Sequence, residues 1–403
     1  MLRDFAERYR RELLDSVIPF WMKHSLDREF GGYFTCLDRE GAVYDTTKYI
    51  WLHGRAAWTF SKLYNAVERR QEWLDAAGII LDFARLNGRD PEGHFYFSLS
   101  REGRPAFYQR KPYSGTFVAI GCIEYFKATG EREYLNEAIE IFWRVKDWIE
   151  RPALLGRPVY AGQSHVSQLA DWMVLAMMLM ELAAVHDDPR YRPLMRECFE
   201  GTLRHLDRSR NILLENAVPG DSSFRNTPNG RLFCPGSAAE LAWFLLHLLR
   251  FEPDSARQGQ VLDILEASLE FGWDRECGGL YYFMDIDGKP PLPLESPMKL
   301  WWSHTEALYA VILAYTLTLE RRWLGWIEKL DRYAFEHFSD PQYGEWFGYC
   351  DRRGERTSEC KGNNYKGAYH VPRFLLYSAQ AIERAEQTVP VSSGFPSGGE
   401  RSV

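Results

Sequence analysis

A short motif that recurs along the chain limits its fold more than any other feature. Each copy has a glycine turn, then alternating aromatic and small residues, then an acidic-Gly or Arg-Gly turn, as in DREFGGYFTCLDREG. Such a pattern predicts a short β-hairpin. The starts lie about 53–67 residues apart, which indicates a repeated architecture. Four clear copies begin at Asp27, Asp90, Asp274 and Asp340, a weaker one covers 210–221, and a barely recognisable sixth covers 157–162.

The segments between the hairpins have amphipathic helical periodicity, mostly with two helices in each repeat. Gly residues and Pro-Asp or Asp-Pro pairs separate them, as expected for helix ends. Two helices in each of six repeats predict an all-α fold, an (α/α)6 barrel of six helical hairpins with short β-hairpins over the active-site mouth. The predicted helices include 51–68, 73–86, 114–129, 134–151, 166–185, 191–206, 237–250, 258–271, 304–320 and 323–338.

No linker divides this pattern, so we predict that residues 1–386 form a single barrel domain. The remaining residues, 387–403 (QTVPVSSGFPSGGERSV), are rich in Ser, Gly and Pro and have no periodicity. This composition predicts a disordered tail without a function of its own.

Charge and composition exclude several classes of protein. The net charge of −7 and the lack of a basic block argue against a nucleic-acid partner. The chain has no run of about 18 apolar residues, so we predict no membrane span. The charged N-terminus does not resemble a secretory signal. Seven scattered cysteines without a CxxC pair favour free thiols in a reducing cytoplasm. Aromatic residues make up 15% of the chain, which suits carbohydrate binding or a large aromatic core.

Polar residues interrupt an apolar run at 299–307, KLWWSHTEA. At helical spacing Lys299, Ser303 and Glu306 share one stripe, and His304 lies on the neighbouring face. The combination of Trp pairs and polar groups is typical of a pocket for a sugar. The alternative is a helix end where the tryptophans cover a buried, hydrogen-bonded histidine.

A second candidate lies in the first predicted barrel helix. Trp51, Arg55, Trp58 and Lys62 follow at positions i, i+4, i+7 and i+11, so an arginine stands between two indoles on one face. Its guanidinium could donate two hydrogen bonds to a carbonyl or hydroxyl pair. The alternative is an arginine that extends past aromatic packing to reach solvent.

A third candidate follows the turn CPGS. Ser237 and Glu240 lie along one side of a predicted helix, together with Phe244 and His247. They could contact a substrate. Equally, Ser237 could be the N-cap of this helix and Glu240 its capping-box partner three residues later.

The last candidate is the stretch 361–373, KGNNYKGAYHVPR. Its glycines allow close backbone approach, and His370 could act as a general base near neutral pH. The alternative is a histidine that caps the next helix. No HxH, HxxxH or HExxH spacing predicts a metal site. Paired carboxylates could also serve glycoside hydrolysis, with Glu215, Glu240, Glu295, Glu306 and Glu345 as candidates.

With these motifs in place, the chain resembles the N-acylglucosamine 2-epimerase family, also known in mammals as renin-binding protein. The resemblance runs nearly end to end and implies the six-hairpin barrel. It also implies epimerisation at C2 of an open-chain sugar, or aldose–ketose isomerisation, through proton abstraction beside the carbonyl. The matching stretches are HSLDREFGGYFTCLDREGAVYD, KYIWLHGRAAWTFSKLYN, LLENAVPGD, WDRECGGLYYFMDIDGKPP, LESPMKLWWSHTEAL, DPQYGEWFGYCDRRGE and KGNNYKGAYHVPR.

The resemblance implies roles for particular residues. Arg55 would hold the carbonyl end of the substrate, His370 and His304 would be active-site histidines, and Glu240 would support the site. We therefore predict the catalytic residues His370, His304, Arg55 and Glu240, and no metal ligand. The predicted substrate-binding residues are Trp51, Trp58, Tyr113, Ser237, Trp302, Glu306, Trp346 and Lys366.

One departure from the family pattern bears on catalysis. Where the family has a PGH turn with a catalytic histidine, this chain has Cys234-Pro235-Gly236-Ser237. Serine cannot hold a proton between steps as imidazole does, and loss of one acid/base group typically costs roughly 10²–10⁴-fold in rate. His304 and His165 are the histidines that could substitute. The alternatives are a sugar-binding or regulatory homologue with impaired catalysis and, with less support, a carboxylate-based glycosidase.

The resemblance also bears on cofactors and partners. It implies no required cofactor, ATP as an allosteric effector, a small-molecule sugar as substrate, and a homodimer. The pair Asn363-Asn364 departs from the Gly-rich form associated with nucleotide activation.

Overall fold

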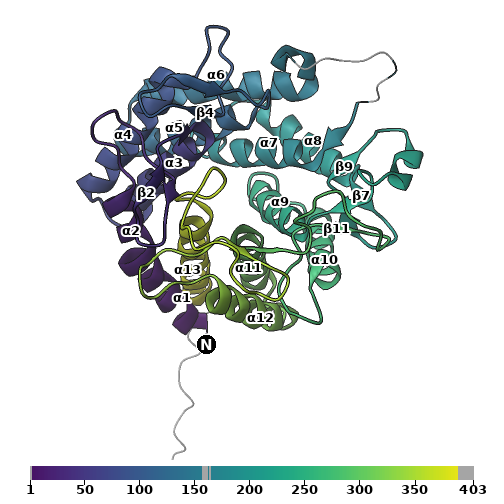
Figure 1. The fold of residues 1–403 in the computed structure, drawn as a ribbon. Helices are drawn as coiled ribbons and strands as arrows, with labels where there is room; N and C mark the ends of the chain where they lie inside the picture. Colours follow the sequence, from purple (N-terminus) through teal and green to yellow (C-terminus); the bar gives the residue numbers. More distant parts are fainter. Residues whose placement is uncertain (1, 157–161, 163–164, 389–403) are drawn as a thin grey trace, which may run out of the picture.

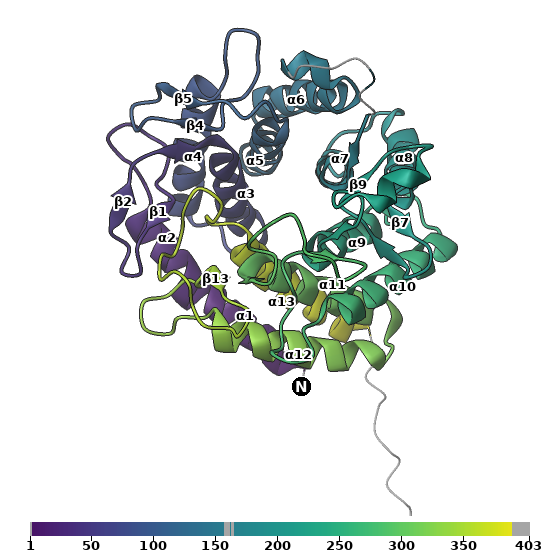
Figure 2. The ribbon, with the colours of Figure 1, turned by 45° about the vertical axis from the view of Figure 1, so that its right-hand side comes forward.

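A computed structural model describes residues 2–156, 162 and 165–388. Within these residues the helices form a double ring, in which an inner set alternates along the chain with an outer set (Figures 1 and 2). The inner helices are α3 (Ile50–Ala66), α5 (Tyr113–Thr129), α7 (Leu169–Leu182), α9 (Pro235–Leu248), α11 (Trp301–Thr318) and α13 (His370–Thr388). The outer helices are α1 (Leu2–Arg11), α4 (Gln71–Asn87), α6 (Arg132–Glu150), α8 (Tyr191–Leu203), α10 (Ser255–Gly272) and α12 (Arg322–His337).

This arrangement is the predicted (α/α)6 barrel. The π-helical turn η1 (Glu12–Val17) and α2 (Ile18–His24) continue α1, and 3-10 helices occur at η2 (Pro152–Leu155) and η3 (Ser222–Asn226). The predicted tail begins two residues too early, because α13 continues to Thr388. The rest of the predicted tail, 389–403, lies outside the described residues.

Helix composition explains the two rings. Inner helices such as α7, α9 and α11 are apolar on nearly all sides, and every residue of α9 is buried. A helix without a polar face must be covered all round. Outer helices such as α6 and α12 have one buried and one exposed face. Where α3 packs on α5, a Cβ on Gly54 would stand 2.2 Å from the carbonyl carbon of Phe117, so glycine permits this close approach.

Short antiparallel strands gather at the end of the barrel where the inner helices begin. Several of these helices follow directly on a strand, as α3 follows β3 and α11 follows β12. The N-termini of the inner helices, with their positive dipole ends, therefore face the same mouth. The pairs are β1 (Cys36–Leu37) with β2 (Val43–Asp45), β3 (Lys48–Tyr49) with β4 (Ser98–Leu99), β4 with β5 (Pro105–Phe107), β6 (Ser167–Gln168) with β9 (Asn216–Ala217), β7 (Leu206–Asp207) with β8 (Ile212–Leu213), β10 (Leu232–Phe233) with β11 (Met284–Asp285), and β12 (Lys299–Leu300) with β13 (Tyr349–Cys350).

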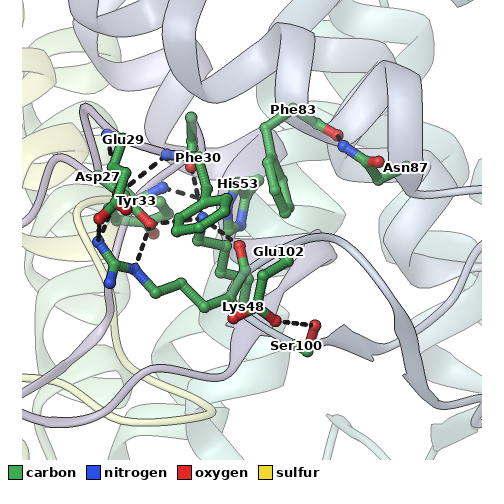
Figure 3. A network of polar contacts seen from close by, with 12 residues as sticks. Asp27, Glu29, Phe30, Tyr33, Lys48, His53, Phe83, Asn87, Ser100 and Glu102 are labelled. Atoms are coloured by element: carbon green, nitrogen blue, oxygen red, sulfur yellow. Dashed lines mark hydrogen bonds and ion pairs between the residues drawn. The ribbon is translucent and has the colours of Figure 1, made fainter.

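The repeated motif has a structural role that its hairpins alone do not explain. Figure 3 shows Asp27 next to Lys48 of β3, the strand that leads into α3. Asp27 accepts hydrogen bonds from Lys48 Nζ at 2.9 Å and Arg101 Nε at 2.9 Å. We call such a trio an Asp–Lys–Arg clamp. The others join Asp274 with Lys299 and Arg352, and Asp340 with Lys361 and Arg39.

The structure also bears on the other sequence predictions of the fold. The four clear motifs each begin with a turn closed by an isolated bridge, as between Leu26 and Tyr33. The hairpin predicted at 157–162 falls on residues of which 157–161 lie outside the described part. Buried apolar side chains form one cluster that extends from Ala6 to Ile382. Among the described residues, no helix combines the length and apolarity that a membrane span requires.

Candidate active site

A cavity of about 490 Å³ opens at the mouth, over the first turns of the inner helices. Its walls are mainly aromatic, with a few charged groups and one histidine. This combination suits a ligand with polar edges and flat apolar faces. The lining residues are Trp51, Arg55, Glu240, Tyr282, Glu295, Met298, Leu300, Trp301, Trp302, Tyr349, Tyr365 and His370.

His370 is the first residue of α13 and is oriented by a carboxylate. Its Nδ1 lies 2.7 Å from Oε1 of Glu306, which can only accept, so Nδ1 carries the proton. Nε2 of the neutral ring is then left with a lone pair. Burial lowers the pKa of His370 well below its usual value, and the Arg55 charge lowers it further, although Glu240 opposes this. The geometry therefore defines a neutral imidazole that can act as a base.

Arg373 contacts both glutamates of the site, Glu240 and Glu306. Its Nη2 donates to Oε2 of Glu306 at 2.8 Å and also contacts Oε1 of Glu240. Trp243 Nε1 donates to the same oxygen of Glu306 at 2.9 Å. These contacts fix Glu306, and through it the ring of His370.

Arg55 supplies a positive charge that none of the described side chains neutralises through a hydrogen bond or ion pair. Its Nε is buried without an acceptor, and its guanidinium lies 4.3 Å from the ring centre of Trp51 and 3.9 Å from that of Phe117. Burial lowers the pKa of Arg55 to about 10, so the group stays charged near neutral pH. A cation held only by aromatic faces is ready to bind an oxygen that gains negative charge.

Several residues predicted from the sequence lie together in this cavity. Trp51, Arg55, Glu240, Trp302 and His370 line it. Glu306, also predicted to bind the substrate, does not line the cavity and contacts His370 from behind it. These residues come from α3, α9, α11 and α13, far apart in the chain.

Ser237 lies in the first turn of α9 and does not line the cavity. It is the third residue of a helix that begins at Pro235 with Cys234 as N-cap, so the alternative that Ser237 is itself the cap is wrong. Ser237 precedes Glu240 by three residues, which puts both on one helix face. Glu240, which contacts Arg373, is not a capping-box partner.

The structure contradicts the prediction that His304 transfers protons. His304 is fully buried outside the cavity; its Nδ1 lies 2.7 Å from the carbonyl oxygen of Leu300, and its Nε2 accepts from the amide of Leu280 at 2.9 Å. Both ring nitrogens are therefore satisfied by the backbone. Burial lowers the pKa of His304 to about 3. The alternative of a buried, hydrogen-bonded histidine is correct, and it leaves the role to His370.

The same structural element occurs at the first motif. His53 accepts from the amide of Tyr33 at 3.2 Å and contacts the carbonyl of Tyr49 at 2.9 Å (Figure 3). In each case the histidine ties the glycine turn to the following inner helix. Lys299 belongs to the clamp of the later motif and lies in β12, not in the helix, so the predicted stripe of Lys299, Ser303 and Glu306 is wrong.

Three predicted substrate-binding residues lie elsewhere as packing or ion-pair partners. Trp58 is buried and donates to Glu181 at 3.2 Å, and Trp346 is buried and donates to Glu12 at 3.0 Å. Lys366 is buried in an ion pair with Glu345 at 2.6 Å. None lines the cavity. Sequence spacing identified their helices and loops, but not the direction of their side chains.

Tyr113 lines a smaller neighbouring cavity of about 160 Å³. Trp51 and Tyr365 line both cavities, and the hydroxyl of Tyr113 lies 3.3 Å from Gln168 and from Asp171. Tyr113 is therefore next to the main cavity, where an extended substrate could reach it. His165, the other histidine suggested as a substitute, is exposed and does not line the main cavity.

Sequence reasoning missed Arg373 as well as several cavity residues on loops. Arg373 follows His370 by three residues in HVPR, so helical spacing could have placed both on one face. Tyr282, Met298 and Tyr365 on loops and Tyr349 in β13 carry no comparable signal, because tertiary contacts position them.

Glu240, Glu306 and His370 could together offer ligand atoms to a metal ion. Yet the Arg373 guanidinium already lies between the two carboxylates. A cation there would face a fixed positive charge, so these residues suit hydrogen bonding better than metal binding.

Fold and site together define an enzyme that moves protons on a carbohydrate, a sugar epimerase or isomerase. The sequence model of N-acylglucosamine 2-epimerase (GlcNAc 2-epimerase) matches residues 32–372. The chain belongs to this family of carbohydrate epimerases and isomerases.

Comparison with individual proteins agrees. The chain is 39% identical to N-acylglucosamine 2-epimerase of Rattus norvegicus over 391 residues, which cover 94% of this chain and 92% of that protein. It is 33% identical to cellobiose 2-epimerase of Dictyoglomus turgidum, with 90% and 95% covered. The structure of cellobiose 2-epimerase from Spirochaeta thermophila has the same fold, with a TM-score of 0.80, 21% identity, and 95% and 98% of the two chains covered.

Proposed function

We propose that this enzyme interconverts N-acylated hexosamines that differ in configuration at C2, such as N-acetylglucosamine and N-acetylmannosamine. Sugar 2-epimerisation is the activity of its family, and the N-acyl sugar is supported by the similarity to the mammalian enzymes across nearly the full length of both chains. The observation that supports this chemistry is a neutral His370, hydrogen-bonded to the Glu306 carboxylate, beside the unneutralised charge of Arg55.

The reaction begins with the open-chain sugar, whose C1 carbonyl acidifies the hydrogen on C2. Nε2 of His370 takes this proton, and the electron pair of the C–H bond moves through C2–C1 onto the carbonyl oxygen. Arg55 stabilises the resulting enolate oxyanion at the C1 oxygen. Glu306 accepts the Nδ1 hydrogen bond and stabilises the imidazolium that forms.

The fate of the enolate decides the product. A proton returned to C2 on the opposite face gives the 2-epimer, whereas a sugar with a hydroxyl at C2 gives a ketose when the proton is delivered to C1. A single base on one face suffices for isomerisation, but epimerisation needs a donor on the second face. An aldose–ketose isomerase is therefore the nearest alternative activity.

The carboxylate-based glycosidase finds less support. A glycosidase needs one carboxylic acid as proton donor and a second carboxylate. Here Arg373 contacts both Glu240 and Glu306 and holds them as hydrogen-bond acceptors. The likeness to a GH76 α-mannanase, with 14% identity and a TM-score of 0.58, concerns the fold alone.

The test is incubation with N-acetylmannosamine, N-acetylglucosamine, mannose or glucose in D₂O, followed by NMR. We expect deuterium at C2 and formation of the epimer with the N-acetyl sugars. His370→Gln should lower the rate roughly 10²–10⁴-fold, while the exposed His165→Gln should retain it. A wild-type protein that binds these sugars without exchange would instead support the impaired, sugar-binding homologue that Ser237 suggests.

Three further properties are proposals. On the resemblance we propose a homodimer and ATP as an allosteric effector rather than a required cofactor, and on the free cysteines we propose a cytoplasmic location. Light scattering of the purified protein tests the dimer, and the rate with and without ATP tests the effector.

A further inference from the structure

Epimerisation requires proton donors on both faces of C2, and the cavity contains one histidine. Of its acidic lining residues, Glu240 contacts Arg373, and Glu295 is exposed on a loop. Burial raises the pKa of Tyr282 far above neutrality. The second donor must therefore be sought beside the cavity, on the wall across from α13.

Glu215 does not itself line the cavity, but its backbone is fixed next to the start of α9, the helix that contributes Glu240 to the lining. It follows β8 and precedes β9; its amide donates to the carbonyl of Leu232 at 2.9 Å, and its carbonyl accepts from the amide of Leu169 at 2.8 Å. Leu232 belongs to β10, which leads into α9, and Leu169 begins α7. The residue is thus held between the starts of two inner helices.

One carboxylate oxygen of Glu215 is buried without a hydrogen-bond partner. Leaving this atom, Oε1, buried without a partner is costly. Burial raises the pKa of Glu215 to about 7, and the neighbouring Ser237 hydroxyl opposes this only partly. The carboxyl can therefore both hold and release a proton near neutral pH.

Its neighbours place the carboxyl beside residues that line the cavity. Ser237 is one turn before the cavity residue Glu240 on the same face of α9. The charge of Glu215 also raises the pKa of Tyr282, which lines the cavity, and of Cys234, the N-cap of α9. Among the described residues, no cation contributes to the pKa shift of Glu215.

We propose that Glu215 is the second acid/base group of the reaction, acting on the face of C2 opposite His370. This inference rests on the proposed epimerisation. Glu215, next to the small side chain of Ser237, would transfer the proton that a second histidine at that turn would otherwise transfer.

The proton transfers balance. In one direction neutral His370 takes the C2 proton, and protonated Glu215 gives its own proton to C2 of the enolate from the other side. The enzyme is left with imidazolium and carboxylate, and exchange with water restores the starting forms. In the reverse direction carboxylate Glu215 is the base and imidazolium His370 the acid.

Glu215→Gln tests this assignment, because it keeps the shape of the side chain and removes its proton transfer. The matched control is Glu200→Gln, an exposed carboxylate on α8. In D₂O we expect the Glu215→Gln enzyme to form epimer more slowly by about 100-fold or more. It should still exchange the C2 hydrogen of one epimer, with configuration retained, because His370 reaches that face. The control should match the wild type.

The exchange pattern separates a catalytic role from a structural one. Unchanged epimerisation in Glu215→Gln would overturn the inference and leave the proposed function intact. Equal loss of exchange from both epimers would also overturn it, since a distorted site affects both faces. A wild type without any exchange would overturn the proposed function and this inference together.

The pH profile of the unmodified enzyme gives a second test. With His370 as base, the active form has a neutral imidazole and a protonated Glu215. As pH rises through about 7, Glu215 loses its proton, so kcat/KM should fall by about tenfold per pH unit above that point. A kcat/KM that stays constant to pH 9 would contradict the assignment.

Discussion

Two histidines in this protein have similar sequence surroundings but different hydrogen-bond partners. His304 and His370 are both buried near the starts of inner helices. The ring nitrogens of His304 are both bound to backbone groups, whereas Nε2 of His370 remains for the substrate. Sequence reasoning found both residues but could not rank them, because the difference lies in which way each ring faces.

His304→Asn should therefore lower stability and spare catalysis. The shorter side chain cannot span both the Leu300 carbonyl and the Leu280 amide, and each unpaired group costs about 1–3 kcal/mol. We expect a lower urea midpoint and nearly unchanged kcat for the folded fraction. A kcat as low as that of a His370 variant, in a fully folded protein, would restore His304 as a catalytic candidate.

The charge of Arg55 should set the pH range of the base. Burial and then Arg55 lower the pKa of His370, so the neutral ring persists below the usual histidine range. The acid limb of kcat/KM should lie below about pH 6.5 in the wild type. Arg55→Met removes one of the causes, so this limb should move to higher pH, in addition to a loss of rate. An acid limb at the same pH in both enzymes would show that Arg55 does not act on His370.

At the scale of elements, the repeated motif serves mainly to join hairpins to helices. Its acidic residue forms the Asp–Lys–Arg clamp, and its glycine turn is tied to the next helix by a histidine in two copies. The sequence therefore predicts the helices and turns well, because periodicity and glycines are local signals. The prediction misplaces Lys299, since a two-residue strand such as β12 leaves no periodic trace.

A clamp variant should destabilise the protein without touching the cavity. Lys299→Met leaves Asp274 buried with Arg352 as its remaining cation, and breaking such a buried pair costs about 3 kcal/mol. Lys289→Met, at an exposed lysine, should be neutral. Urea unfolding at pH 7 measures both. Equal midpoints for the two variants would show that the clamp contributes no stability.

The same clamp should weaken in acid. Burial raises the pKa of Asp274, but Arg352, the amide of Cys277 and Lys299 outweigh this, so its pKa is lowered overall. A group with a lowered folded-state pKa contributes stability above its unfolded value of about 3.9 and loses it as pH falls below that value. The difference between wild type and Lys299→Met should thus shrink below about pH 4.

At the scale of the whole molecule, the chain closes into a ring through its two ends. α1 packs on α13, and Tyr9 of α1 is buried with its hydroxyl 2.8 Å from Asp331 of α12. The cavity draws its residues from α3, α9, α11 and α13, so it exists only when the ring is closed. Repeat counting predicted this architecture, but the meeting of distant loops above the mouth depends on closure and has no local sequence signal.

Closure of the ring predicts that residues 1–386 unfold as one unit. Tyr9→Ala removes a large buried side chain and should cost about 3 kcal/mol, whereas Arg3→Ala, at an exposed ion pair, should cost almost nothing. Helix content by circular dichroism and epimerase activity should then be lost at the same urea concentration, and Tyr9→Ala should shift both midpoints equally. If activity disappeared at lower urea while most helix content persisted, the N-terminal helices would form a separate unit, and the single-domain prediction would be wrong.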